Sequence, residues 1–106
     1  MRVRVSIDPP ADELLTGGAT IRTFIEDTSR VGDAARPVAE STIGVDQMHS
    51  AKPVEMTCRE PSADEFFTVR VHVDVNGSGQ VEVGDLVSTA AHRAIDGDVQ
   101  IPLRRV

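Results

Sequence analysis

Apolar and polar residues alternate along most of the chain, which is the period of a β-strand with one buried face. The alternation is cleanest in residues 66–73, where every second residue is apolar: Phe67, Val69, Val71 and Val73. We expect these four side chains to face a core. The residues between them are expected to point outward: Thr68, Arg70 and His72.

The same pattern predicts further strands at residues 2–7, 19–30, 37–45, 53–60 and 99–106. Phe24 lies opposite the inward face of its segment, so both faces of that strand are expected to be partly covered. Residues 86–95 fit a strand or a short helix. Pro102 indicates that the last strand lies at a sheet edge, because proline cannot donate to a ladder.

Turn-forming clusters of proline, glycine and acidic residues separate these segments. About seven short strands in one chain of 106 residues are typical of an all-β fold, a two-sheet antiparallel β-sandwich. Three phenylalanines are the only aromatic side chains of the Phe, Tyr and Trp class, so valine and isoleucine must fill the core. We expect residues 1–106 to form a single β-sandwich domain.

Charge and composition exclude some functions. The chain has 11 basic and 17 acidic residues, whereas nucleic-acid binders need clustered Lys and Arg. No stretch approaches ~18 consecutive apolar residues, which excludes a transmembrane helix. The N-terminal residues lack the apolar segment of a signal peptide, and no cysteine near them offers a lipidation site. We therefore expect the chain as given to be cytoplasmic, unless a signal was removed.

Cys58 is the only cysteine, so no intramolecular disulfide can form. It alternates with Val54 and Met56 on an apolar face. This pattern predicts a buried, unreactive thiol.

A motif occurs between residues 19 and 43. An alternating strand leads to D-x-S, then to an acidic–Ala pair and a short strand ending in T-I; the matching residues are Ala19, Ile21, Asp27, Ser29, Asp33, Ala34, Thr42 and Ile43. With the lead-in at Pro9 and Pro10 and the strand–turn–strand of residues 67–89, this pattern resembles the YbaY/YscW-like family. That family includes small envelope lipoproteins and the pilotin chaperones of type III secretion secretins. The resemblance covers roughly residues 3–95 and implies a β-sandwich.

Residues 74–85 have the spacing of an EF-hand-type calcium loop. Such a loop takes oxygen ligands at positions 1, 3, 5, 7, 9 and 12 and has glycine at position 6. The corresponding ligands are Asp74, Asn76, Ser78, the carbonyl of Gln80, Glu82 and Asp85, with Gly79 at the turn. The preceding segment predicts a strand, so an ion would be held between a strand and residues 86–92.

A second interpretation makes the same residues a long hairpin turn. Asn76 and Gly77 form a strong turn dipeptide, because both tolerate positive φ. The acidic residues would then only keep the turn solvated. The sequence leaves both interpretations open.

The remaining polar residues form no convincing site. His72 and His92 could lie on neighbouring strands and hold zinc, but no third ligand has recognisable spacing, which favours surface histidines. No nucleophile, acid–base pair or phosphate loop has the required pattern. We therefore expect no enzyme, but a binding or assembly module that meets a protein partner through a sheet edge or face, with calcium binding as the alternative.

Overall fold

The computed structural model describes residues 1–8, 18–30, 32, 34–44 and 53–106. In these ranges the chain forms strands and no helix. The strands are β1 (Arg2–Asp8), β2 (Thr20–Asp27), β3 (Arg36–Gly44), β4 (Val54–Thr57), β5 (Phe67–Asp74), β6 (Leu86–Ser88), β7 (His92–Arg93) and β8 (Gly97–Arg105). The predicted all-β class is confirmed, and residues 86–95 hold two short strands instead of a helix.

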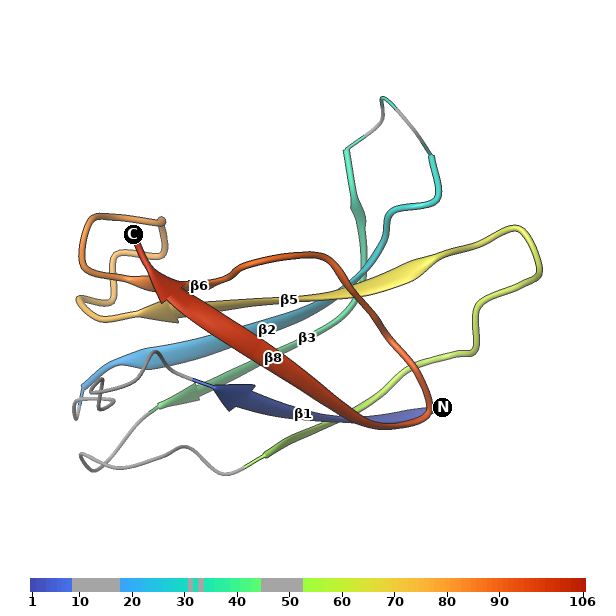
Figure 1. Cartoon of the computed structure of the whole chain (residues 1–106), viewed down its shortest axis with the longest axis horizontal. Helices are drawn as coiled ribbons and strands as arrows, with labels where there is room; N and C mark the ends of the chain where they lie inside the picture. The colour runs from blue at the N-terminus through green and yellow to red at the C-terminus, as the bar shows by residue number, and fades with distance from the viewer. Residues whose placement is uncertain (9–17, 31, 33, 45–52) are drawn as a thin grey trace.

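The strands follow one hydrogen-bonded path, in the order β3-β2-β5-β6-β8-β1-β4, with β7 added to β5. The sheet coils until its two end strands, β3 and β4, approach each other (Figure 1). The result is a nearly closed, barrel-like sheet, and not clearly the two-sheet sandwich that the sequence predicted. One pairing is also parallel, between β1 and β8, where an antiparallel fold was expected.

The core lies inside this coiled sheet and is built mainly from valine and isoleucine. The four residues predicted to face inward from β5 are all buried, at most 1% exposed. Val3, Val5, Ile21, Ile25 and Ile101 from the neighbouring strands pack with them. Because β-branched side chains fit a pleated surface, the core needs few aromatic rings. Phe67 is the one aromatic side chain in it among the described residues.

Pro102 does not mark an edge strand, contrary to the sequence-based expectation. It lies inside β8, which has β1 on one side and β6 on the other. Pairing with β1 ends at Pro102, opposite Asp8, and pairing with β6 begins at Leu103. The missing N–H therefore falls where β8 changes partner, at a point where the carbonyl of Pro102 still accepts the N–H of Thr89 at 3.3 Å.

The outward face of β2 and β5 is partly covered, as the position of Phe24 in the sequence pattern predicted. The guanidinium of Arg70 lies 4.1 Å from the ring centroid of Phe24 and bonds to Glu26. On β4, Val54 and Met56 are buried, while Cys58 after the strand is half-buried against the core. The thiol is thus less enclosed than predicted.

Candidate functional site

The calcium-like loop begins where β5 ends and folds back over the outward face of the sheet. Asp74, the last residue of β5, points outward yet has no exposed surface. Its Oδ1 accepts the N–H of Gly77 at 2.9 Å and its Oδ2 accepts the N–H of Gly79 at 2.7 Å. Both glycines have positive φ, 74° and 82°, which turns their N–H groups toward the carboxylate. Asp74 therefore fixes the first half of the loop.

Asp85 does the same for the second half of the loop. It precedes β6 and is also fully buried. Its Oδ1 accepts the N–H of Val75 at 3.1 Å, and its Oδ2 accepts the N–H of Glu82 at 3.0 Å. The first and last positions of the predicted ligand set thus hold both ends of the loop through backbone hydrogen bonds.

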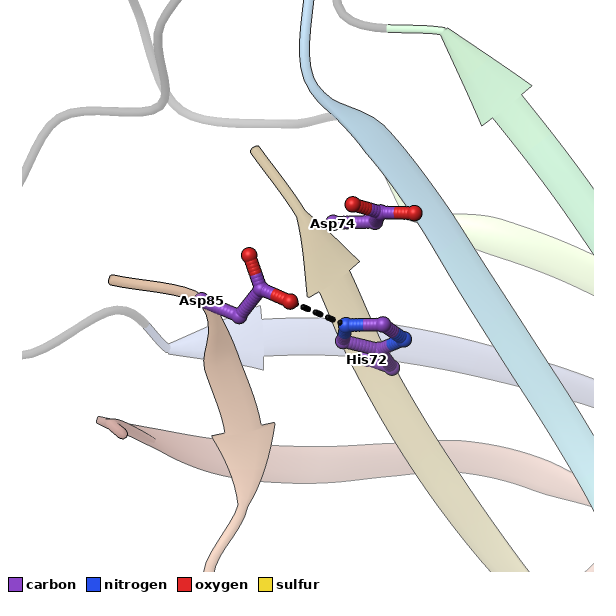
Figure 2. A group of neighbouring side chains, drawn as sticks. All are labelled: His72, Asp74 and Asp85. Carbon is purple, nitrogen blue, oxygen red and sulfur yellow. Dashed lines mark hydrogen bonds and ion pairs between the residues drawn. The ribbon is translucent and has the colours of Figure 1, made fainter. Parts of the chain in front are cut away.

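His72 lies beside these two aspartates and bonds to Asp85. Its Nε2 lies 2.8 Å from Oδ2 of Asp85, and its side chain is 4% exposed. Figure 2 shows Asp85 reaching across from the segment before β6 to the ring of His72 on β5. One ligand atom from each of His72, Asp74 and Asp85 lies within 4.8 Å of the others. The prediction that His72 points outward is confirmed, but the expectation of a surface histidine is wrong, because the side chain is buried beside Asp85 of the loop.

Arg22 supplies a counter-charge to this group. It lies directly opposite His72 in the ladder between β2 and β5. Its Nη2 is 3.6 Å from Oδ2 of Asp74, and its buried Nε has no hydrogen-bond partner. The guanidinium is therefore near the carboxylate without the short, direct contact of a charge-assisted hydrogen bond.

Hydrogen bonds make both buried carboxyl groups more acidic. The N–H of Gly79 has the largest effect and lowers the pKa of Asp74 below its ordinary value of 3.8, although burial opposes it. For Asp85 burial is the largest influence and acts to raise the pKa. The hydrogen bonds from His72, Val75 and Glu82 outweigh it, so the pKa of Asp85 is also lowered. Both groups are ionised at neutral pH.

The middle positions of the predicted calcium set lie apart from this buried group. Asn76, Ser78, Gln80 and Glu82 are exposed. The side chain of Asn76 donates to Glu82, and the hydroxyl of Ser78 donates to the carbonyl of Gln80. The structure thus brings together Asp74 and Asp85 and leaves the other four in local contacts on the surface.

The second histidine considered for zinc, His92, lies on β7 opposite Val69 of β5, whereas His72 lies opposite Val87 of β6. The two histidines are on neighbouring strands as predicted, but no contact joins them. Nε2 of His92 is buried without a hydrogen-bond partner. His49 lies outside the described residues.

Several motif residues of the family resemblance have structural roles. Ala19 and Ile21 are buried in the core. Asp27 ends β2 by accepting hydrogen bonds from the N–H and the hydroxyl of Ser29. Thr42 and Ile43 pair with Arg22 and Ile21 across the β2–β3 ladder. Asp33 and the lead-in prolines lie outside the described residues.

No protein-family profile matches the chain, and no curated protein sequence matches it significantly. Among solved structures, the chain is similar to an alternative pilotin from the type II secretion system of Vibrio cholerae. The two share 15% sequence identity, with a TM-score of 0.83 over 100% of this chain and 96% of the pilotin. At that identity the likeness establishes a pilotin-like fold. It does not establish the YbaY/YscW-like family.

Across the described ranges, the structure contains no helix of the length and apolarity that a membrane span requires.

Proposed function

We propose that this chain is a non-catalytic β-domain of the YbaY/YscW-like type that binds another protein during assembly of the cell envelope or a secretion apparatus. The observation that carries the proposal is the full-length structural likeness to a type II secretion pilotin. The motif residues from Ala19 to Ile43 support it independently, because their resemblance to the family rests on the sequence alone. Pilotin chaperones of secretins belong to the family that these residues resemble, so a secretin subunit is the partner to test first.

Strand addition at β3 is the mode of binding that we favour. β3 is at one end of the strand path and pairs with β2 along one side only; its other side approaches β4 without joining it in the hydrogen-bonded path, within the described part of the sheet. An unpaired strand edge offers backbone N–H and C=O groups to an incoming extended segment. Ile43 near the end of β3 is 44% exposed and offers an apolar contact beside that edge.

The test is binding of a purified secretin subunit to the folded chain, measured by isothermal titration calorimetry or by surface plasmon resonance. Ile43→Lys adds a charge at the β3 edge and is expected to weaken binding about tenfold or more, because a desolvated charge opposes docking. Ile95→Lys is the matched control, since Ile95 is 48% exposed and lies between β7 and β8, neither of which neighbours β3 in the sheet, so it should leave binding unchanged. Equal affinity of the two variants and wild type would refute docking at β3. Absence of any binding by the folded wild-type chain would refute the secretin partner.

Calcium binding at residues 74–85 is the second candidate. The convergence of Asp74 and Asp85, the first and last ligands of the predicted set, favours it. A calcium ion takes six to eight oxygen ligands. Asn76, Ser78, the carbonyl of Gln80 and Glu82 would have to leave their present contacts and turn toward the two aspartates. A calcium-dependent rise in melting temperature is the signature of this function.

A further inference from the structure

We propose that His72, Asp74 and Asp85 form a binding site for a divalent transition metal such as zinc. This inference is separate from partner binding at β3. It shares Asp74 and Asp85 with the calcium loop but adds His72 and takes a different metal. Two of its residues come from one strand: His72 and Asp74 are two positions apart on β5 and therefore project from the same face. Asp85 reaches them from the segment that leads into β6 (Figure 2).

The donor set determines the class of metal. One imidazole nitrogen with two carboxylate oxygens suits zinc and its first-row neighbours, whereas calcium prefers oxygen ligands alone. Three protein ligands with one position left for water is the arrangement of an open zinc site. These three side chains need no rearrangement of the exposed loop residues, because they already lie within 4.8 Å of one another.

In this structure a hydrogen bond between His72 and Asp85 takes the place that a metal ion would occupy. Two ligands of a tetrahedral zinc ion are about 3.3 Å apart, since each lies about 2.0–2.1 Å from the metal. Nε2 of His72 and Oδ2 of Asp85 are 2.8 Å apart, the distance of a hydrogen bond. To admit the metal, these two groups would separate by about 0.5 Å, and the nearest oxygen of Asp74, which lies within 4.8 Å of both, would move in to a similar spacing. The Nε2 proton then moves to Nδ1 in a neutral ring, or is released to solvent from a protonated ring.

The surroundings of the two carboxylates are those of a supported site. Each carboxylate oxygen accepts a backbone N–H: those of Gly77 and Gly79 for Asp74, and those of Val75 and Glu82 for Asp85. Hydrogen bonds of this kind orient metal-binding carboxylates and leave a lone pair for the metal.

Arg22 is a counter-charge that a metal could replace. Its Nη2 is 3.6 Å from Asp74, its Nε has no hydrogen-bond partner, and its side chain is 28% exposed. The guanidinium can therefore move toward solvent when a cation binds between the carboxylates.

The experiment is titration of the untagged full chain with Co²⁺, followed by displacement with Zn²⁺. Visible absorption reports Co²⁺ coordination, and isothermal calorimetry gives the stoichiometry. We expect one metal per chain. His72→Gln should weaken binding about tenfold or more, since removal of even an indirect partner of a ligand costs 10–100-fold. The matched controls are His92→Gln, which removes a histidine outside the site, and Glu82→Gln, which removes a calcium ligand. Both should bind as wild type does.

A second measurement covers the case in which His72→Gln does not fold. In the ¹⁵N-labelled wild-type chain, zinc should shift the imidazole resonances of His72 and leave those of His92 in place. Absence of cobalt spectra and of zinc-induced shifts at millimolar metal would overturn the proposal. Metal binding that survives His72→Gln, or that shifts another histidine, would overturn it equally.

Discussion

Nε2 of His72 lies 2.8 Å from Oδ2 of Asp85, and both side chains are buried on the outward side of the sheet. Asp85 is ionised and accepts only, so the imidazole donates. The same oxygen accepts the N–H of Glu82 at 3.0 Å. One carboxylate thus ties a strand of the barrel-like sheet to the loop that covers it.

Asp85→Asn is expected to destabilise the chain. The amide keeps one acceptor oxygen, but its NH₂ group would face N–H donors that bond to the carboxylate in the wild-type chain. Leaving buried donors unsatisfied costs about 1–3 kcal/mol. Urea denaturation followed by circular dichroism measures the loss. Glu82→Gln is the control, because this exposed side chain bonds only to Asn76 and should change stability by less than about 0.5 kcal/mol. Equal midpoints for the two variants would contradict the role assigned to Asp85.

Stability is expected to fall in acid. The pKa values of Asp74 and Asp85 are lowered in the folded state from an ordinary value of 3.8. The unfolded chain therefore takes up protons first as the pH falls, which favours unfolding. The contribution of these groups is complete above about pH 5 and is lost progressively below about pH 4 as the pH approaches the folded-state values.

The free energy of unfolding measured in urea at several pH values between 7 and 2 checks this expectation. Asp74→Asn should be less stable at neutral pH and should show a shallower acid loss than wild type, since it removes one titrating group. The idea fails if wild type and Asp74→Asn lose stability in parallel below pH 4.

Gly79→Ala is expected to cost about 1–2 kcal/mol. Gly79 has φ of 82°, where an L-residue is strained, even though a Cβ would meet no atom within 4 Å. In the alanine variant, relief of this strain would turn the N–H of residue 79 away from Asp74. In the wild-type chain that N–H donates to Asp74 at 2.7 Å. Thermal melts measure the cost. Gly44→Ala is the matched control, because its φ is ordinary and its Cβ position is also open. A loss no larger than that of Gly44→Ala would contradict the argument.

The positions of the strands could be predicted because each has one buried face. Alternation along β5 identified Phe67, Val69, Val71 and Val73 as core residues, and all four are buried. Strand order could not be predicted in the same way. Val3 pairs with Gly97 across the parallel β1–β8 ladder, and nothing near either residue in the sequence specifies that partner. The near closure of the sheet depends on such long-range pairs.

The sequence predicted part of the candidate site. The spacing of residues 74–85 identified Asp74 and Asp85 as candidate metal ligands. The alternation along β5 also predicts that His72 lies on the outward face. Asp74 comes two residues later, so the same alternation puts its side chain on that face too. The burial of His72 could not be read from the pattern, because its partner Asp85 belongs to an irregular loop and not to a strand. Gly77 and Gly79 indicated a turn, but nothing in the sequence specified that their N–H groups would bond to Asp74.

Calcium is expected to raise the melting temperature if residues 74–85 bind it. A ligand that binds only the folded state at tenfold above its Kd adds about 1.4 kcal/mol, which is several degrees for a chain of this size. Melts followed by circular dichroism in millimolar calcium, in excess EGTA and in magnesium measure the effect. Asn76→Ala removes a ligand of the calcium set that the group of His72, Asp74 and Asp85 does not use. Loss of the calcium shift in Asn76→Ala, with retention of zinc binding, would assign the two metals to different ligand sets. Superimposable melts in calcium and EGTA would make the loop a hairpin turn closed by its own aspartates.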